Sequence, residues 1–308
     1  MGIVSWMLRS LSNMRTHGIS PGLQQAAYEF KQGAARRIDS HVFGTSIFEL
    51  QWDVLILFDA CRPDLLEEVA DDRPFLPAEI DTIYSLASGS RSWMERNFNP
   101  EWSSEMARTA YVTGNPFSDE YLDAEEFELL DEVWEYAWDD DIGTIPPRPI
   151  TDRAIEVGRN GNHDRLIIHY MQPHFPSIPD PLNSSIDIDC FGDGWESVWD
   201  DLKAGTVSSE RVWKSYRANL EYVLDDVALL LNNLAAETVV LSADHGNAFG
   251  EFGFYGHPPY NPLPMLRRVP WVVTSATDYQ THEPVIDRER TERTDETVSS
   301  RLEDLGYL

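Results

Sequence analysis

Short runs of consecutive apolar residues recur along this chain, and several of them end in charged or polar residues. The four clearest runs cover residues 53–58, 166–171, 239–243 and 269–273. A run of this length, rich in leucine and β-branched residues and without alternation, indicates a strand that is buried on both faces. Buried strands separated by helical segments predict an α/β fold, with a doubly wound, mostly parallel central sheet and helices on both faces.

Segments between these runs show the spacing of helices. We expect helices over 63–70, 92–98 and 215–234, another that opens at Thr151, and a short last helix near the C-terminus. Residues 119–141 are strongly acidic but keep apolar positions, which predicts an amphipathic helix with a solvated acidic face. Residues 177–206 predict a long loop that could close over a site.

The first 48 residues differ in character from the rest. Apolar residues recur at near-helical spacing from Ile3 to Met14, and the basic residues of this segment have almost no acidic neighbours. This predicts a basic amphipathic helical segment over 1–48, followed by a single α/β domain over 49–308. Such a helix could lie on an anionic membrane surface, with contact through residues 1–40, or it could pack on the core or on another subunit.

Acidic side chains stand where two of the buried strands end. Asp59 directly follows the first run, and Asp244 and His245 follow the third run in the stretch VVLSADHGN. Open α/β sheets bind ligands at the carboxyl edge, where two carboxylates and an imidazole can hold one divalent cation. Taken alone, Asp59 could simply cap the next helix. Because Asp244 and His245 stand at an equivalent strand end, we favour a metal site.

Several pieces of the sequence, taken in order, resemble the sulfatase and alkaline-phosphatase superfamily. They are DACRPD, YSLASGSRSW, IIHYMQPHFP, YRANLEYVLDDVALLL, VVLSADHGNAFGEFGFYGH, LRRVPWVV and RLEDLGYL, and together they extend over residues 50–308. The Asp-His-Gly block with its Gly-Glu and later His is the most specific piece. The resemblance implies an alkaline-phosphatase-like doubly wound core, a divalent metal, and transfer or hydrolysis of a phosphate or sulfate ester.

One motif of the family is missing. Sulfatases of the formylglycine type carry Cys-x-Pro-x-Arg, whereas the corresponding region here reads SLASGSRS over residues 85–92. No formylglycine can form without the cysteine, so a serine nucleophile and phosphoryl chemistry are expected instead. The family places its nucleophile at a helix N-terminus, which favours phosphate oxygens, and Gly89 before an expected helix fits this geometry. The candidates are Ser88 and Ser90, with Ser85 and Ser92 in reserve, and each could instead be an ordinary helix cap.

Three further side chains are candidates for contact with the transferring group. Arg91 could grip a tetrahedral oxyanion in bidentate fashion, or pair with a surface carboxylate. His174 and His257 match family positions beside this group, and either could donate a proton to the leaving alcohol. The expected metal ligands form an O/O/N set that suits Mn²⁺ or Zn²⁺, with Ca²⁺ and Mg²⁺ as the remaining alternatives.

The net charge of the chain limits the salt conditions and the partners that suit the protein. Asp and Glu number 53 against 24 Lys and Arg, which gives a net charge of −29, and only three residues are lysines (Lys31, Lys203 and Lys214). Such a chain repels itself unless salt screens the charge. We therefore predict a halophilic protein that loses stability in low salt. The same acidity argues against nucleic acid as a partner.

The sequence also carries signals about location. Two cysteines make no disulfide framework, and no run of about 18 apolar residues suggests a membrane span. The N-terminus lacks the continuous apolar core of a secretory signal. We expect a cytoplasmic protein, with a peripheral place at the inner membrane face as the alternative.

These features together predict a metal-dependent hydrolase or transferase that acts on a phosphate ester through a serine nucleophile. The ester could be a small molecule or be linked to a glycan or lipid. Hydrolysis of a sulfate ester is the second hypothesis, and a non-catalytic metal- or anion-binding member of the fold is the third.

Overall fold

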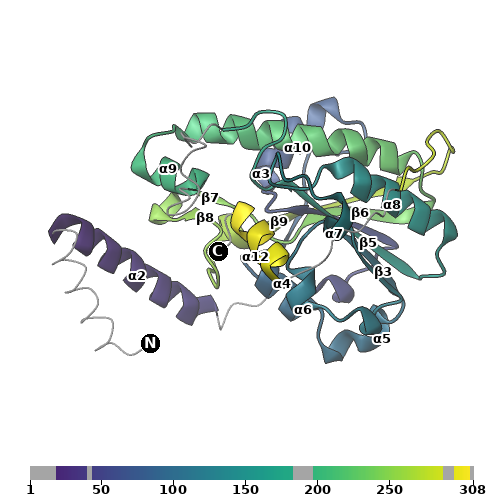
Figure 1. The fold of residues 1–308 in the computed structure, drawn as a ribbon, viewed down its shortest axis with the longest axis horizontal. Coiled ribbons are helices and arrows are strands. Elements are labelled where there is room, and N and C mark those ends of the chain that lie inside the picture. The colour runs from purple at the N-terminus through teal and green to yellow at the C-terminus, as the bar shows by residue number, and fades with distance from the viewer. Residues whose placement is uncertain (1–18, 40–43, 183–196, 287–294, 306–308) are drawn as a thin grey trace.

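A seven-stranded sheet forms the centre of the molecule in the computed structural model, which describes residues 19–39, 44–182, 197–286 and 295–305 (Figure 1). Its strands lie in the order β2, β9, β6, β1, β5, β3, β4. Their bounds are Val54–Asp59 (β1), Thr82–Tyr84 (β2), Thr109–Thr113 (β3), Leu129–Glu132 (β4), Arg165–Pro173 (β5), Ala236–Ala243 (β6) and Arg268–Ala276 (β9). The strands from β6 to β4 pair in parallel, while β9 pairs antiparallel with both β6 and β2. The expected mostly parallel sheet is confirmed.

Strand β1 lies between β5 and β6, and all of its residues are buried. Ile56 and Phe58 belong to the core on one face of the sheet, whereas Leu55 and Leu57 belong to the core on the other. Successive side chains of a strand point to opposite faces, so a strand covered on both sides needs apolar residues throughout. This is why the first apolar run shows no alternation.

Helices cover both faces of this sheet. Their bounds are Ile19–Asp39 (α2), Pro63–Val69 (α3), Ser90–Asn97 (α4), Ser103–Met106 (α5), Ser118–Tyr121 (α6), Trp134–Ala137 (α7), Pro147–Asn160 (α8), Val198–Ala204 (α9), Ser209–Leu231 (α10), Pro264–Arg267 (α11) and Asp295–Asp304 (α12). Helices α8 and α10 pack on β5 and on each other, with α3 beside α10. On the opposite face, Trp93 and Met94 of α4 pack against Leu55 and Leu57. The fold is therefore doubly wound, as the sequence predicts.

The prediction of one amphipathic helix over 119–141 is wrong. This segment forms the end of α6, then β4, then α7. Strand β4 pairs in parallel with β3, from Ala110 opposite Leu129 to Thr113 opposite Glu132. Leu129 packs on one face of the sheet and the adjacent Leu130 on the other, which only a strand allows. Tertiary pairing thus overrides the helical spacing.

Three helices begin earlier than the sequence suggests, and one of them is α8, which begins at Pro147 and not at Thr151. Helix α10 begins at Ser209 because the hydroxyl of Ser208 caps it, accepting a hydrogen bond from the backbone N–H of Arg211 at 3.2 Å. Helix α4 begins at Ser90, directly after Gly89, and not at position 92. The earlier start places a serine hydroxyl at the first helical position, where it bears on the site described below.

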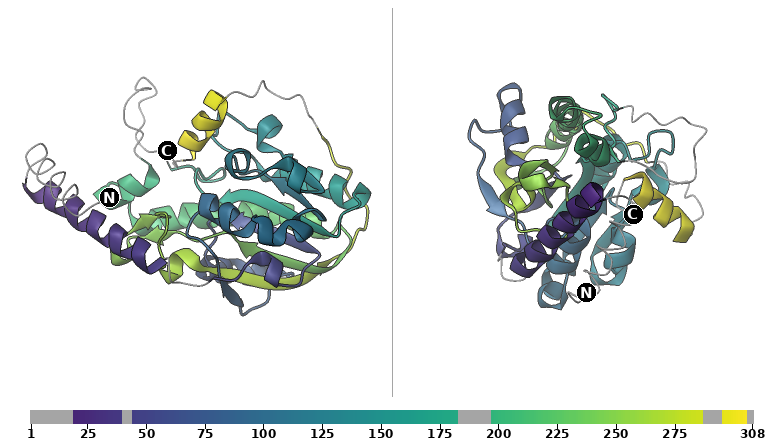
Figure 2. Two further views of the ribbon diagram at one scale, coloured as in Figure 1. Left: turned by 90° about the horizontal axis from the view of Figure 1, so that it is seen from below. Right: turned by 90° about the vertical axis from the view of Figure 1, so that its left-hand side faces the viewer.

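Of the N-terminal segment over 1–48, the structure describes helix α2 and residues 44–48, and the apolar positions expected between Ile3 and Met14 lie outside the described residues. The helix lies at one end of the molecule, near α9 and the small sheet of β7 (Ala248–Phe249) and β8 (Tyr255–Gly256) (Figure 2). Lys31 Nζ donates to the backbone carbonyl of Phe252 at 3.2 Å, and the Tyr28 ring lies 5.9 Å from that of Phe254. These contacts attach α2 to the α/β domain.

At the other end of α2, the buried carboxylate of Asp39 accepts hydrogen bonds from Arg267 at 3.0 Å and Arg96 at 2.9 Å. Of the predicted loop over 177–206, residues 183–196 lie outside the described residues, and α9 forms within the rest. Within the described ranges, every helix is too short or too polar to cross a membrane.

Candidate functional site

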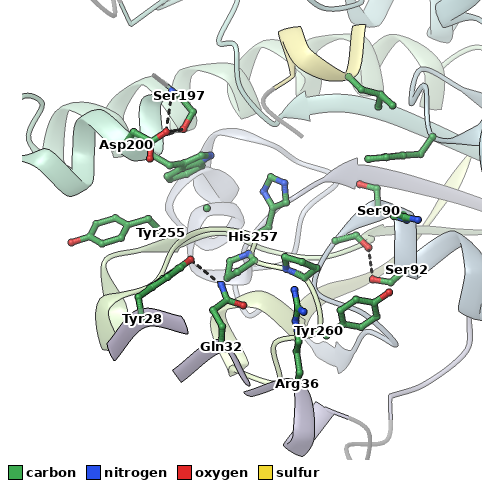
Figure 3. A pocket seen from close by; sticks show the side chains of 18 of the residues that line it. Tyr28, Gln32, Arg36, Ser90, Ser92, Ser197, Asp200, Tyr255, His257 and Tyr260 are labelled. Atoms are coloured by element: carbon green, nitrogen blue, oxygen red, sulfur yellow. Dashed lines mark hydrogen bonds between the residues drawn. The ribbon is translucent and has the colours of Figure 1, made fainter. Parts of the chain in front are cut away.

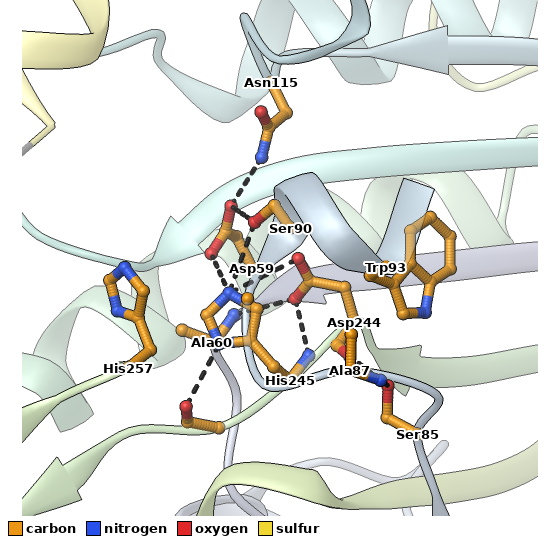
Figure 4. Close-up of polar contacts among 12 residues, drawn as sticks. Asp59, Ala60, Ser85, Ala87, Ser90, Trp93, Asn115, Asp244, His245 and His257 are labelled. Carbon is orange, nitrogen blue, oxygen red and sulfur yellow. Dashed lines mark hydrogen bonds and ion pairs between the residues drawn. The ribbon is translucent and has the colours of Figure 1, made fainter. Parts of the chain in front are cut away.

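Two carboxylates and an imidazole meet at the carboxyl edge of the sheet (Figure 4). Asp59 ends β1, and Asp244 and His245 directly follow β6, which pairs in register with β1 up to Phe58 opposite Ala243. All three side chains are fully buried, and one ligand atom from each lies within 4.8 Å of the others. His245 Nε2 is 3.5 Å from Asp59 Oδ1 and 3.5 Å from Asp244 Oδ2. We call these three residues the metal group.

Asp244 is oriented by the backbone around it. Its Oδ1 accepts hydrogen bonds from the N–H of Ala60 at 3.0 Å and the N–H of His245 at 2.8 Å. Its Oδ2 accepts no hydrogen bond from any described residue, although the atom is buried. Burial alone raises the pKa of Asp244, but the neighbouring His245 and the hydrogen bonds it accepts outweigh burial and lower it. A buried, ionised oxygen without a donor fits a divalent cation bound among the three side chains.

Asp59 is oriented by side chains from two other segments. Asn115 Nδ2 donates to Asp59 Oδ2 at 2.8 Å, and the Ser90 hydroxyl donates to the same oxygen at 3.2 Å. Asn115 is fully buried and follows β3, which ends at the same edge of the sheet. Neither β3 nor Asn115 is among the elements and site residues predicted from the sequence. The signal was present in the stretch TAYVTGNP, where a β-branched run ends in a polar residue.

Among the four candidate serines, the structure brings Ser90 to the metal group. Its hydroxyl lies 3.2 Å from His245 Nε2 as well as 3.2 Å from Asp59 Oδ2. Ser88 instead donates to the carbonyl of Pro258 at 3.0 Å, and Ser92 to the carbonyl of Gly89 at 3.3 Å. Ser85 donates to the backbone carbonyl of Asp244. The last three serines therefore bond to backbone, while Ser90 bonds to the metal group.

Three histidines lie around the metal group. The His257 ring is centred 4.9 Å from that of His245 and 5.0 Å from that of His174. Burial, and then the neighbouring His245 and His174, lower the pKa of His257 well below its ordinary value. Burial and then His245 lower the pKa of His174 to about 4. Both rings are therefore neutral near pH 7, so either would have to take up a proton before it could donate one to the leaving alcohol.

The hydrogen bond of His257 fixes the position of its proton. Its Nδ1 lies 2.9 Å from the side-chain oxygen of Asn247, which can only accept. Nδ1 therefore carries the hydrogen, and Nε2 is the basic nitrogen of the ring. Asn247 is itself buried.

His169 also borders the metal group. Its Nε2 lies 3.7 Å from Asp244 Oδ2, and its Nδ1 lies 2.8 Å from the hydroxyl of Tyr111. Burial lowers its pKa to about 4.

Two arginines have different places around the site. Arg91 is exposed, 3.8 Å from Glu120, and its guanidinium lies over the Tyr121 ring. Arg62 lies within the DACRPD motif but was not predicted as a site residue, and it joins the two loops that carry the metal group. Its guanidinium donates to the backbone carbonyl of Asn247 at 3.1 Å and to Glu251 at 2.6 Å. Arg62 thus holds the loop after β1 against the loop after β6.

A pocket of about 540 Å³ adjoins the metal group (Figure 3). Ser90 and His257 line it together with Arg91, so it opens onto the candidate nucleophile. Its outer part is formed by α2, α9 and the segment after β8. We call the lining residues Tyr28, Arg36, Trp199, Lys203 and Tyr260 the rim.

Comparisons with known proteins give similarity of fold alone. No protein-family model matches the chain, and no curated protein does. A solved structure of the soluble domain of a lipooligosaccharide phosphoethanolamine transferase A from Neisseria meningitidis is 15% identical, with a TM-score of 0.43, and the match covers 74% of this chain and 77% of that one. The periplasmic domain of EptC from Escherichia coli, in complex with Zn, is 11% identical, with a TM-score of 0.47 and coverage of 80% and 79%.

A protein assigned as a sulfatase, from Bacteroides fragilis, is 16% identical, with a TM-score of 0.24 and coverage of 43% and 31%. These solved structures belong to the superfamily that the sequence motifs resemble. At these low TM-scores and identities, the activities of the neighbours do not transfer to this chain.

Proposed function

We propose that this protein is a metal-dependent hydrolase or transferase that acts on a phosphate ester, with Ser90 as the nucleophile. The position of the Ser90 hydroxyl carries the proposal, because it lies 3.2 Å from two side chains of the metal group and faces the pocket. Asp59, Asp244 and His245 would hold the cation. When bound, a divalent cation polarises the ester oxygens and stabilises the charge of the transferring group.

Ser90 is the first residue of α4, so the N–H groups of the first turn point toward the site of attack. A helix N-terminus favours the negative oxygens of a phosphoryl group. In the first step, the Ser90 oxygen attacks phosphorus, the bond from phosphorus to the ester oxygen breaks, and the leaving oxygen takes a proton from water to become the alcohol. The hydroxyl proton passes to Asp59 Oδ2, which already accepts its hydrogen bond.

A phosphoseryl intermediate would result, and a second step would release it. Water or a second alcohol attacks phosphorus, the bond from phosphorus to the Ser90 oxygen breaks, and Ser90 takes back the proton held by Asp59. A base must take the proton of the attacking molecule. His257 fits this role because it is neutral, lines the pocket and has Nε2 as its basic nitrogen. Attack by water makes the protein a hydrolase, and attack by an alcohol makes it a transferase.

Paired serine variants test this proposal. Ser90→Ala should lower turnover of an aryl phosphate about 1,000-fold or more while divalent metal stays bound. Ser88→Ala is the matched control, since its hydroxyl bonds to Pro258, and it should keep activity within about threefold. Equal loss in both variants, or full activity of Ser90→Ala, would reject Ser90 as nucleophile. Aryl phosphate, phosphodiester and sulfate should be compared with Mn²⁺, Zn²⁺, Mg²⁺ and Ca²⁺, because sulfate hydrolysis remains the second candidate.

We also propose a cytoplasmic place for this reaction, with a lipid- or glycan-linked ester reached at the membrane face. Removal of residues 1–18 tests the membrane contact, because it leaves α2 and the pocket lining in place. Loss of co-sedimentation with anionic vesicles is expected, and unchanged partitioning would reject the contact. Removal of residues 1–40 would be less specific, since Tyr28 and Arg36 line the pocket.

A further inference from the structure

The rim of the pocket carries positive charge in a chain whose net charge is −29. Arg36 of α2 and Lys203 of α9 both line the pocket that contains Ser90. Lys203 is one of only three lysines in the sequence. In Figure 3, the side chain of Arg36 extends from α2 into the pocket, beside Tyr260. Cations are scarce in this protein, so two of them at the mouth of the candidate site call for a physical reason.

Aromatic rings hold both cations in place without neutralising them. Lys203 Nζ lies 5.0 Å from the centre of the Tyr28 ring, and Arg36 Cζ lies 5.8 Å from the centre of the Tyr260 ring. Cation–π contacts orient a cation and leave its charge available to a ligand. Within the described ranges, neither Arg36 nor Lys203 takes part in an ion pair.

The acidic residues of the pocket are engaged elsewhere. Asp200 accepts hydrogen bonds from the hydroxyl of Ser197 at 2.8 Å and from its N–H, which caps α9. Glu120 accepts from the hydroxyl of Tyr121 at 2.9 Å and lies near Arg91. Each acid therefore has a partner other than the two rim cations, which remain available to an incoming anion.

We propose that Arg36 and Lys203 form an anion subsite that recognises a second negative group on the alcohol part of the substrate. The inference rests on the proposed function, in which the phosphate of the ester binds beside the metal group and Ser90. The alcohol part then extends toward the rim. The preferred substrates are esters whose alcohol carries a carboxylate or a further phosphate, since a guanidinium and an ammonium both bind such groups.

The rim disfavours substrates whose alcohol part carries a positive charge. Tyr28 and Tyr260 resemble the walls of a cage for quaternary ammonium groups, but cations of the protein already lie over them: Lys203 over the Tyr28 ring, and Arg36 and Arg96 over the Tyr260 ring. A cationic head group would be repelled there. The subsite therefore selects for anionic rather than cationic alcohols.

Binding of alkylphosphonates tests the subsite without any need for turnover, because the P–C bond resists hydrolysis. The probes end in a carboxylate, a phosphonate or a hydroxyl, over a range of chain lengths. Calorimetric titration uses the full chain with excess Mn²⁺ or Zn²⁺, at the lowest KCl concentration at which circular dichroism shows it folded. Probes with a terminal anion should bind about five- to tenfold more tightly than the hydroxyl probe.

The double variant Arg36→Gln/Lys203→Gln should lose this preference, while the affinity for the hydroxyl probe stays within about twofold. Lys214→Gln is the matched control, because it removes an exposed lysine of α10 that lies outside the pocket lining. It should keep the preference. The relative affinity of carboxylate and phosphonate probes then identifies which anion the subsite prefers.

Failure of the subsite and failure of the proposed function give different results. If all probes bind equally, or if the double variant keeps the preference, the subsite is overturned while the phosphate site stands. If no phosphonate binds, both are overturned. Loss of anionic-vesicle binding in the double variant, without a preference among soluble probes, would also overturn the subsite and assign these cations to a lipid surface.

Discussion

The metal group and the rim of the pocket are built in opposite ways. The metal group stands at the ends of two adjacent parallel strands, and its three side chains are fully buried. The rim comes from α2, α9 and the segment after β8, and its two cations are exposed. The sheet therefore fixes the candidate chemistry, whereas the packing of peripheral helices sets what the pocket admits. Changes in one region should leave the function of the other largely intact.

The largest expected difference between the metal group and the rim concerns metal binding. Asp244→Asn keeps the oxygen that accepts from Ala60 and His245, but it replaces the negative Oδ2 with an amide nitrogen. Affinity for Mn²⁺ or Zn²⁺, measured by calorimetry, should fall at least about 100-fold. Glu120→Gln, a change of the same kind in the outer pocket, should alter metal affinity less than about twofold. Equal effects of the two variants would contradict the distinction.

The pH dependence of stability should come largely from the buried histidines around the metal group. His169, His174 and His257 all have a lowered pKa in the folded chain. As pH falls below about 6.5, the unfolded chain takes up protons that the folded chain refuses, so stability falls. The loss is at most about 1.4 kcal/mol per pH unit for each histidine.

One half-buried acid opposes this trend. Burial raises the pKa of Glu132, so its contribution to stability increases as pH falls through the window above its ordinary value. One opposing group against these three histidines, and against His163, whose pKa is also lowered by burial, leaves a net loss of about 3 kcal/mol or more between pH 6.5 and 5.0. Urea unfolding at fixed KCl concentration measures it. Constant stability across this range would show that the histidines are not held neutral.

A smaller effect is expected from the residue that orients Asp59. Asn115→Ala removes the 2.8 Å hydrogen bond to Asp59 Oδ2. Metal affinity should fall about tenfold, the usual cost of losing a partner that orients a ligand. Asn160→Ala, on the exposed end of α8, is a matched control and should have no effect on metal affinity. An unchanged affinity of Asn115→Ala would mean that Ser90 and the backbone orient Asp59 sufficiently.

Salt should change interactions between exposed charges more than interactions within the buried metal group. Raising KCl from about 0.1 M to 3 M screens the net charge of −29, and the melting temperature should rise by about 5 °C or more. Over the same range, the preference of the rim for anions should weaken, because its cations are exposed. A melting temperature that does not change with salt would contradict the prediction of a halophilic protein.

The sequence alone was sufficient to predict most of the buried strands in the interior of the fold. Strands β1, β5, β6 and β9 each contain a long apolar run. A run of this kind predicts a strand even when the adjacent strands of the sheet are unknown. Asp59, Asp244 and His245 could be grouped because the ends of parallel strands share one edge. Strands β2, β3 and β4 of the central sheet were not predicted because they are short, and β4 is a strand only through pairing with β3.

The rest of the site depends on contacts between distant segments. Asn115 lies 56 residues from Asp59 in the sequence, and no local pattern links them. The choice of Ser90 over Ser88 depends on where α4 begins, a boundary that differs by two residues from the expected one. The rim could not be predicted, since it requires the packing of α2 beside α9 and Tyr260.

The most direct test is to find the serine that carries phosphate during turnover. Acid quenching after mixing with an aryl phosphate and metal, followed by fragment-ion mass spectrometry of residues 85–92, separates the four serines. Our account predicts phosphate on Ser90 in the wild type and in Ser88→Ala, and none on any serine in Asp244→Asn. Phosphate on Ser85, Ser88 or Ser92, or turnover without any phosphoserine, would contradict it.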